Sequence, residues 1–215
     1  NRQAEYLKSL FPSINTHIIP VSIPEYFKPN GKPKMPIVSI VTRTPGDAAK
    51  IAKAFYLQYP LYKWITFKEL RGISRKNFAA ELSKSCLAVW VDDAAGFGTF
   101  PVEAMKCGVP VIGKVPNMIP EWMEQPTGDN QERTLKDNGI WTYEMLRLPD
   151  LIATFIRLWL EDSIPADVYE KMMDTPEKYT MEKMKSSVIE YYDREIKTRI
   201  AELSASITQT ELKNN

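Results

Sequence analysis

Blocks of apolar and polar residues predict strands and helices that follow one another along the chain. Residues 37–42 (IVSIVT) form a short apolar run that ends at the turn-forming sequence 43–46 (RTPG). Over residues 48–55 the apolar positions recur at the spacing of one helical face, which predicts a helix. A second strand is predicted near 63–70, and a second helix over 74–85 with Ser74 as its N-terminal cap. These two segments repeat the same order of elements.

The third strand is predicted at 86–91 (CLAVWV), where every position is apolar, as in a strand covered on both faces. A polar, glycine-containing turn at 92–99 leads into a helix with Pro101 in its first turn and Gly108 just past its end. Another strand follows at 109–113. Strands that alternate with helices predict a parallel sheet covered on both faces, so the expected fold is α/β, doubly wound and Rossmann-like.

The flanking regions predict three parts of the chain. Prolines recur through 16–36, after a short apolar strand, and indicate an extended linker. Residues 140–143 predict a last short strand and 151–160 an apolar helix, and from 180 onward apolar residues step by three or four along a long helix. The expected parts are an N-terminal segment and linker (1–36), a Rossmann-like domain (37–175) and a C-terminal helical arm (176–215).

Composition excludes several classes of function. The 28 Lys and Arg residues nearly balance 27 Asp and Glu residues. The resulting net charge of +1 creates no overall electrostatic field that would attract nucleic acid. No apolar run is long enough to span a membrane and no signal peptide is visible, so a cytoplasmic protein is expected. Cys86 and Cys107 in apolar surroundings suit a reducing compartment. The single histidine, His17, lies in the linker region, and no metal-ligand cluster is visible.

The turn between the third strand and its helix is the candidate binding site, because ligands bind at the carboxyl ends of parallel strands. Gly96 and Gly98 allow a tight turn, and the amides of Gly98, Thr99 and Phe100 can point at phosphate oxygens. A turn that only satisfies backbone geometry is the alternative. Glu103, expected in the first turn of the helix, fits either a ligand for ribose hydroxyls or a helix cap.

The sequence GFGTFPVEAMKCGVPVIG (96–113) resembles the signature of the group 1 glycosyltransferases, EGFGLPxLEAMACGxPVV, within the GT-B fold. Segment 19–29 (IPVSIPEYFKP) resembles the interdomain linker of that family. The strand and turn ending at Arg43 resemble the segment with its phosphate-binding arginine, and residues 119–121 (IPE) resemble its proline-glutamate pair.

The resemblance implies a C-terminal nucleotide-sugar-binding domain that holds a UDP-, GDP- or ADP-linked sugar as substrate, without a metal or other cofactor. The acceptor would be bound by a separate N-terminal domain, which is missing here. Arg43 and Lys50 would act on the departing phosphates, an arginine being suited to them by its permanent charge and planar fork. The implied donor-binding residues are Gly96, Phe97, Gly98, Thr99, Phe100 and Glu103.

This chain departs from the family pattern at several positions. Ala95 stands where the family has the first glutamate of its E-x7-E motif, and Asp92 or Asp93 is the nearest substitute. The family lysine after the arginine has no clean match, so Lys50 is the nearest candidate. Because the chain begins at Asn1 rather than Met, we expect a fragment of a larger protein or a trimmed chain. The resemblance implies that this fragment is inactive alone, because a GT-B enzyme works in a cleft between two domains. A non-catalytic nucleotide-sugar-binding module and a GT-B-type UDP-sugar epimerase remain alternatives to a transferase domain.

Overall fold

The computed structural model describes residues 2–94, 96–123 and 139–213. These residues divide into two compact units, one made of residues 23–178 and one that combines residues 1–22 with 179–215. The larger unit contains the sheet and the helices that cover it. Each unit is described separately below.

The larger unit is built on a parallel sheet of five strands in the order β2-β1-β3-β4-β5. The strands are β1 (Met35–Thr42), β2 (Thr66–Glu69), β3 (Ser85–Val91), β4 (Val111–Lys114) and β5 (Ile140–Thr142). Every residue of β3 is buried, as its uninterrupted apolar sequence predicts for a central strand. The parallel, doubly wound arrangement expected from the sequence is confirmed.

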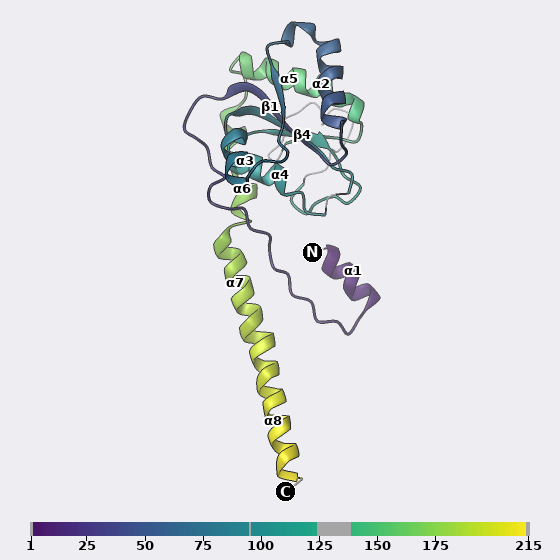
Figure 1. The fold of residues 1–215 in the computed structure, drawn as a ribbon, viewed down its shortest axis with the longest axis vertical. Coiled ribbons are helices and arrows are strands. Elements are labelled where there is room, and N and C mark those ends of the chain that lie inside the picture. The colour runs from purple at the N-terminus through teal and green to yellow at the C-terminus, as the bar shows by residue number, and fades with distance from the viewer. Residues whose placement is uncertain (1, 95, 124–138, 214–215) are drawn as a thin grey trace. The chain divides into compact units, whose positions relative to one another are not determined.

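Helices cover both faces of this sheet (Figure 1). The helix α2 (Asp47–Gln58) and the helix α5 (Leu148–Leu160) pack together on one face. On the other face lie α3 (Arg75–Leu82), α4 (Thr99–Lys106) and α6 (Ala166–Glu177). A short 3₁₀ turn, Pro60–Tyr62, follows α2. Another, Met145–Arg147, precedes α5. The sequence patterns did not reveal α6, which packs against α4.

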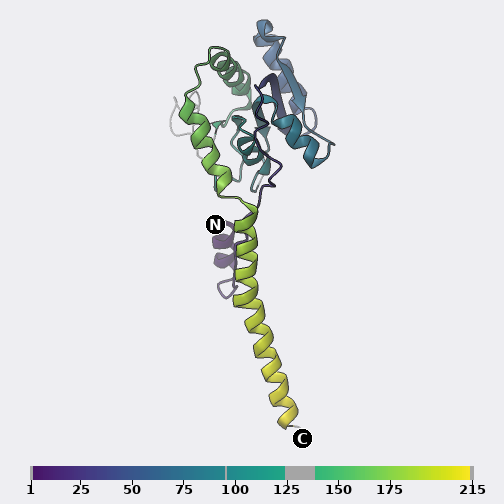
Figure 2. The ribbon, with the colours of Figure 1, turned by 90° about the vertical axis from the view of Figure 1, so that its left-hand side faces the viewer.

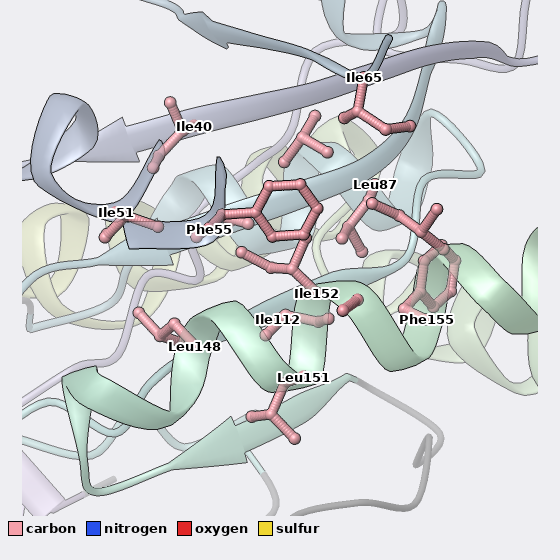
Figure 3. Packing of buried hydrophobic residues seen from close by; sticks show 14 of the residues in the cluster. Ile40, Ile51, Phe55, Ile65, Leu87, Ile112, Leu148, Leu151, Ile152 and Phe155 are labelled. Carbon is pink, nitrogen blue, oxygen red and sulfur yellow. The ribbon is translucent and has the colours of Figure 1, made fainter. Parts of the chain in front are cut away.

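The main hydrophobic core lies between the sheet and the pair α2 and α5 (Figure 3). Phe55 of α2 and Phe155 of α5 are completely buried in it, together with Leu87 of β3. The helical spacing of apolar residues in α2 and α5 is therefore explained by burial of one face of each helix against the sheet. This packing fixes the strands whose carboxyl ends form the candidate site.

The residues from Ile23 to the start of β1 belong to the larger unit and pack within it. Ile23 and Phe27 have no exposed surface, and the Lys106 ammonium of α4 donates a hydrogen bond to the Ile23 carbonyl at 3.1 Å. The apolar strand expected within 16–36 is wrong for residues 16–22, which form no strand. Ile18 and Ile19 are each nearly half exposed, so no sheet covers them.

The smaller unit combines both ends of the chain. It contains α1 (Arg2–Leu10), an extended segment over 12–22, and α7 (Met181–Tyr191), which continues through a π-helical stretch (Tyr192–Lys197) into α8 (Thr198–Lys213) as one long helix (Figures 1 and 2). The predicted long helix after residue 180 is thereby confirmed. His17 from the extended segment stacks on Tyr191, with 5.0 Å between ring centroids. None of the helices in the described part of the chain could cross a membrane.

Candidate functional site

The strand order determines where a ligand can approach the sheet. The chain passes from β1 to β2 on one side and then to β3 on the other, so β1 and β3 flank the point where the direction of winding reverses. Helices leave such a pair on opposite faces, which opens a crevice at the carboxyl ends of the two strands. Arg43 follows β1 and the glycine-containing turn follows β3, so both candidate segments lie at this edge.

The turn after β3 presents the N-terminus of α4. Gly98 is the N-cap residue, with a left-handed φ of +68°, and no side chain caps this end of the helix. The amides of Thr99 and Phe100 occupy the first helical positions, where backbone N–H groups have no partner within the helix. Together with the positive end of the helix dipole, these amides favour an anion. Gly96 and Thr99 are exposed on this turn, while the side chain of Phe100 is buried.

Three tryptophan side chains support this turn from within the domain. Trp90, Trp122 and Trp141 are each at most 7% exposed, and their ring centroids lie 5.7–6.2 Å apart. A Cβ added at Gly98 would lie only 2.7 Å from the Trp90 ring, so the backbone approaches that indole directly. The indole N–H of Trp122 donates to the Phe97 carbonyl at 2.7 Å. The cluster therefore fixes the conformation of the turn.

Replacing Trp122 by phenylalanine is expected to lower the free energy of unfolding by about 1 kcal/mol, because the Phe97 carbonyl loses its indole donor while an aromatic ring remains. Chemical denaturation measures this difference. Trp64→Phe is the matched control, because Trp64 is 45% exposed and a similar change there should cost less. An equal loss in both variants would show that the hydrogen bond does not stabilise the turn.

Glu103 lies deeper in the domain than the sequence suggested. Since α4 begins at Thr99, Glu103 falls in the second turn of the helix, and its expected place in the first turn is wrong. The residue is 1% exposed, and its carboxylate accepts hydrogen bonds from both terminal nitrogens of Arg75 at the start of α3. A carboxylate has about four acceptor positions, so this pairing leaves capacity for a further donor. Contact with a ribose stays a prediction.

Arg75 was not identified by any sequence pattern. Its guanidinium carbon lies 5.1 Å from the Phe27 ring centroid and 5.6 Å from that of Phe78, so two aromatic faces hold the cation beside Glu103. Burial raises the pKa of Glu103, and the hydrogen bond and charge of Arg75, with a hydrogen bond from Thr99, offset that shift only in part. The buried Glu103 carboxylate therefore interacts both with its counterion Arg75 and with the exposed turn residue Thr99.

The two cations predicted to act after β1, Arg43 and Lys50, make different contacts in the structure. Arg43 is 63% exposed, and its Nη1 lies 3.4 Å from both Asp92 Oδ1 and the Ala94 carbonyl, so it meets the turn after β3. Lys50 instead pairs with Asp47 at 2.8 Å on its own helix and is 71% exposed. Ala95, where the family pattern has glutamate, lies outside the described residues.

A further ion pair at this edge was not anticipated. Lys114, the last residue of β4, places its ammonium 2.5 Å from Asp93 Oδ1. Asp92 and Asp93, the aspartates proposed to substitute for the absent glutamate, are thus each paired with a cation at the end of a neighbouring strand. Within the described ranges, no three His, Cys, Asp or Glu side chains gather closely enough to hold a metal ion.

Comparison with known proteins identifies the fold. No protein-family model matches the sequence, and no curated protein matches it. Among solved structures, sucrose-phosphate synthase from Thermosynechococcus elongatus matches 92% of this chain over 57% of its own, with a TM-score of 0.59 and 17% identity. The pneumococcal O-GlcNAc transferase GtfA, solved with UDP and GlcNAc, matches 89% of this chain over 42% of its own, with a TM-score of 0.54 and 14% identity.

A third match has nearly the extent of the present domain. The C-terminal domain of a group 1 family glycosyl transferase from Francisella tularensis is covered over 97% of its length by 73% of this chain, with a TM-score of 0.52 and 14% identity. The chain spans about two-fifths of the pneumococcal transferase and just over half of the synthase. The fold is that of the C-terminal domain of the GT-B glycosyltransferases.

Proposed function

From this fold we propose that the chain is the nucleotide-sugar-binding domain of a glycosyltransferase, acting with an acceptor-binding domain that lies outside it. One observation carries the proposal: the exposed N-terminus of α4, which no side chain caps, and the Arg43 guanidinium both lie at the carboxyl ends of β1 and β3. Both groups bind anions, and this edge is where open parallel sheets bind nucleotides.

Each residue at this edge has a distinct role in the proposal. The amides of Thr99 and Phe100, exposed by the left-handed turn at Gly98, would bind the diphosphate. Arg43 would stabilise the charge that develops on the leaving diphosphate as the bond to the sugar breaks, which is the dominant contribution in sites of this kind. Glu103, fixed by Arg75, would accept hydrogen bonds from the ribose hydroxyls with its remaining acceptor capacity.

Thermal unfolding in the presence of UDP, GDP and ADP, and of their sugar derivatives, tests the proposal. A ligand present at 100 times its Kd is expected to stabilise the domain by about 2.7 kcal/mol, so the melting temperature should rise with ligand concentration. In Arg43→Ala the affinity should fall about tenfold or more, because a charge-assisted contact is lost. Lys53→Ala on α2 is the control for loss of an exposed positive charge. If no nucleotide stabilises the protein, the proposal is wrong.

A non-catalytic nucleotide-sugar-binding module is the second candidate, and a specific observation favours it. Ala95 supplies no carboxylate to a donor sugar, and both neighbouring aspartates are engaged by Arg43 and Lys114. The two functions differ in turnover. A transferase joined to its acceptor domain should release nucleoside diphosphate from the donor, and Arg43→Ala should slow that release. A module should bind the donor without turnover.

A further inference from the structure

We infer that Lys114 is a second diphosphate-binding cation, acting opposite Arg43. The inference rests on the proposed function and identifies a residue that the sequence did not single out. Lys114 ends β4 and Arg43 directly follows β1, and β3 lies between these two strands. Neighbouring strands are about 4.8 Å apart, so the ends of β1 and β4 are separated by roughly 10 Å. Two flexible cationic side chains therefore flank the turn that follows β3.

Two consecutive aspartates hold these cations at the end of β3. Asp92 Oδ1 lies 3.4 Å from Arg43 Nη1, and Asp93 Oδ1 lies 2.5 Å from Lys114 Nζ. Carboxylate oxygens and phosphate oxygens are both anionic acceptors, and lysine and arginine bind either one. In the free protein the aspartates thus occupy the acceptor positions that a bound diphosphate would take over. The two positive side chains are thus held at the edge of the domain by paired carboxylates, so neither cation is without a counterion there.

Backbone hydrogen bonds hold the chain in place directly after Lys114. Beyond the strand, the Val115 amide donates to the Thr142 carbonyl at 2.8 Å, and the Asn117 amide donates to the Asp93 carbonyl at 3.1 Å. The Lys114 side chain is 25% exposed, compared with 71% for Lys50. A partly enclosed lysine has less conformational entropy to lose when it binds an anion. Lys114 is therefore better placed than Lys50 to contact a diphosphate at this edge.

Isothermal titration of the 215-residue chain with UDP, GDP and ADP tests the inference, followed by titration with the monophosphate of the tightest ligand. Lys114→Ala is expected to weaken diphosphate binding about tenfold or more, and to weaken monophosphate binding less. Lys114→Arg should keep most of the affinity. Lys63→Ala is the matched control, because Lys63 precedes β2 at the opposite edge of the sheet and its loss should change neither affinity.

Asp93→Asn separates a binding role from a structural one. This variant breaks the same ion pair but leaves the cation in place, so diphosphate affinity should be retained or increased. If affinity falls as far as in Lys114→Ala, the ion pair only shapes the edge and the inference is overturned. It is also overturned if folded Lys114→Ala binds the diphosphate as tightly as the wild type, and the proposed function then stands. If the wild type binds no nucleotide, both fail.

Discussion

Replacing Arg75 by alanine should lower the free energy of unfolding by about 2–3 kcal/mol at pH 8, because it leaves the Glu103 carboxylate buried without its counterion. Loss of one partner from a fully buried pair costs about 3–5 kcal/mol, and the smaller value allows for screening of the Arg75 side chain, which is 54% exposed. Removal of the guanidinium also ends its contacts with the rings of Phe27 and Phe78. Chemical denaturation of the wild type and the variant measures the difference.

The deficit of Arg75→Ala should shrink as the pH is lowered from 8 towards 5. Burial already raises the pKa of Glu103 above its ordinary value of 4.5, and loss of the guanidinium raises it further. The folded variant therefore binds a proton that the unfolded chain releases above pH 4.5, so its stability is greatest at low pH and declines as the pH rises through the folded-state pKa. In the wild type Arg75 limits this decline.

Two variants control for other causes of this behaviour. Lys76→Ala removes an exposed positive charge from the adjacent position of α3, and its effect on stability should be small at every pH. Glu103→Gln in the Arg75→Ala background removes the buried charge, so the pH dependence of the deficit should disappear. A deficit in Arg75→Ala that stays constant from pH 8 to pH 5 would contradict a charged Glu103 as its source.

Gly98→Ala is expected to destabilise the domain by about 2–5 kcal/mol and to weaken nucleotide binding. Adding a Cβ at a φ of +68° costs about 1–2 kcal/mol, and overpacking adds about 1–3 kcal/mol because the new atom would lie 2.7 Å from the Trp90 ring. Relief of this clash must move either the indole or the turn that presents the Thr99 amide. Denaturation and nucleotide titration of the same variant test both effects.

Other glycines of this chain supply the matched controls. Gly31 and Gly72 have φ values of +68° and +70°, and an added Cβ would meet nothing within 4 Å at either position. Their alanine variants should therefore show the backbone cost alone, about 1–2 kcal/mol. Combining Gly98→Ala with Trp90→Phe should recover part of the lost stability, because the smaller ring makes room. If Gly98→Ala costs no more than Gly72→Ala, the indole does not constrain the turn.

Local sequence patterns predicted the architecture where burial alone determines structure. The wholly apolar β3 was recognisable because a central parallel strand is covered on both faces, and Ser74 was recognisable as the cap of α3. Glycines likewise indicated the turn at the edge of the sheet. These features depend on neighbours in the sequence and on the solvent, so a single sequence contains them.

Features that depend on distant contacts could not be predicted. Arg75 meets Glu103 only because α3 and α4 leave the same edge of the sheet, and nothing near either residue in the sequence indicates the pair. The indole of Trp122 reaches the Phe97 carbonyl in the same way, across two loops. Glu103 was placed one turn too early because Pro101 suggested a later start of α4 than Thr99.

The turn between β3 and α4 is supported from two directions. The tryptophan cluster fixes the backbone at Phe97 and Gly98, and Arg75 fixes Glu103 behind it on α4. A rigid turn keeps the helix amides pointed at the edge of the sheet before any ligand arrives, and such preorganisation reduces the entropy lost on binding.

The central claim, that the edge between β1 and β3 binds a nucleoside diphosphate, is tested most directly by the backbone amide NMR signals of the isotope-labelled protein during titration with UDP, GDP and ADP. At least one ligand should shift the Gly98, Thr99 and Phe100 amides in a saturable way, together with the amide of Arg43, while the amides of Lys63 and Ile65 at the opposite edge stay unchanged. Saturable shifts confined to any other part of the domain, or no shifts with any of the ligands, would contradict the claim.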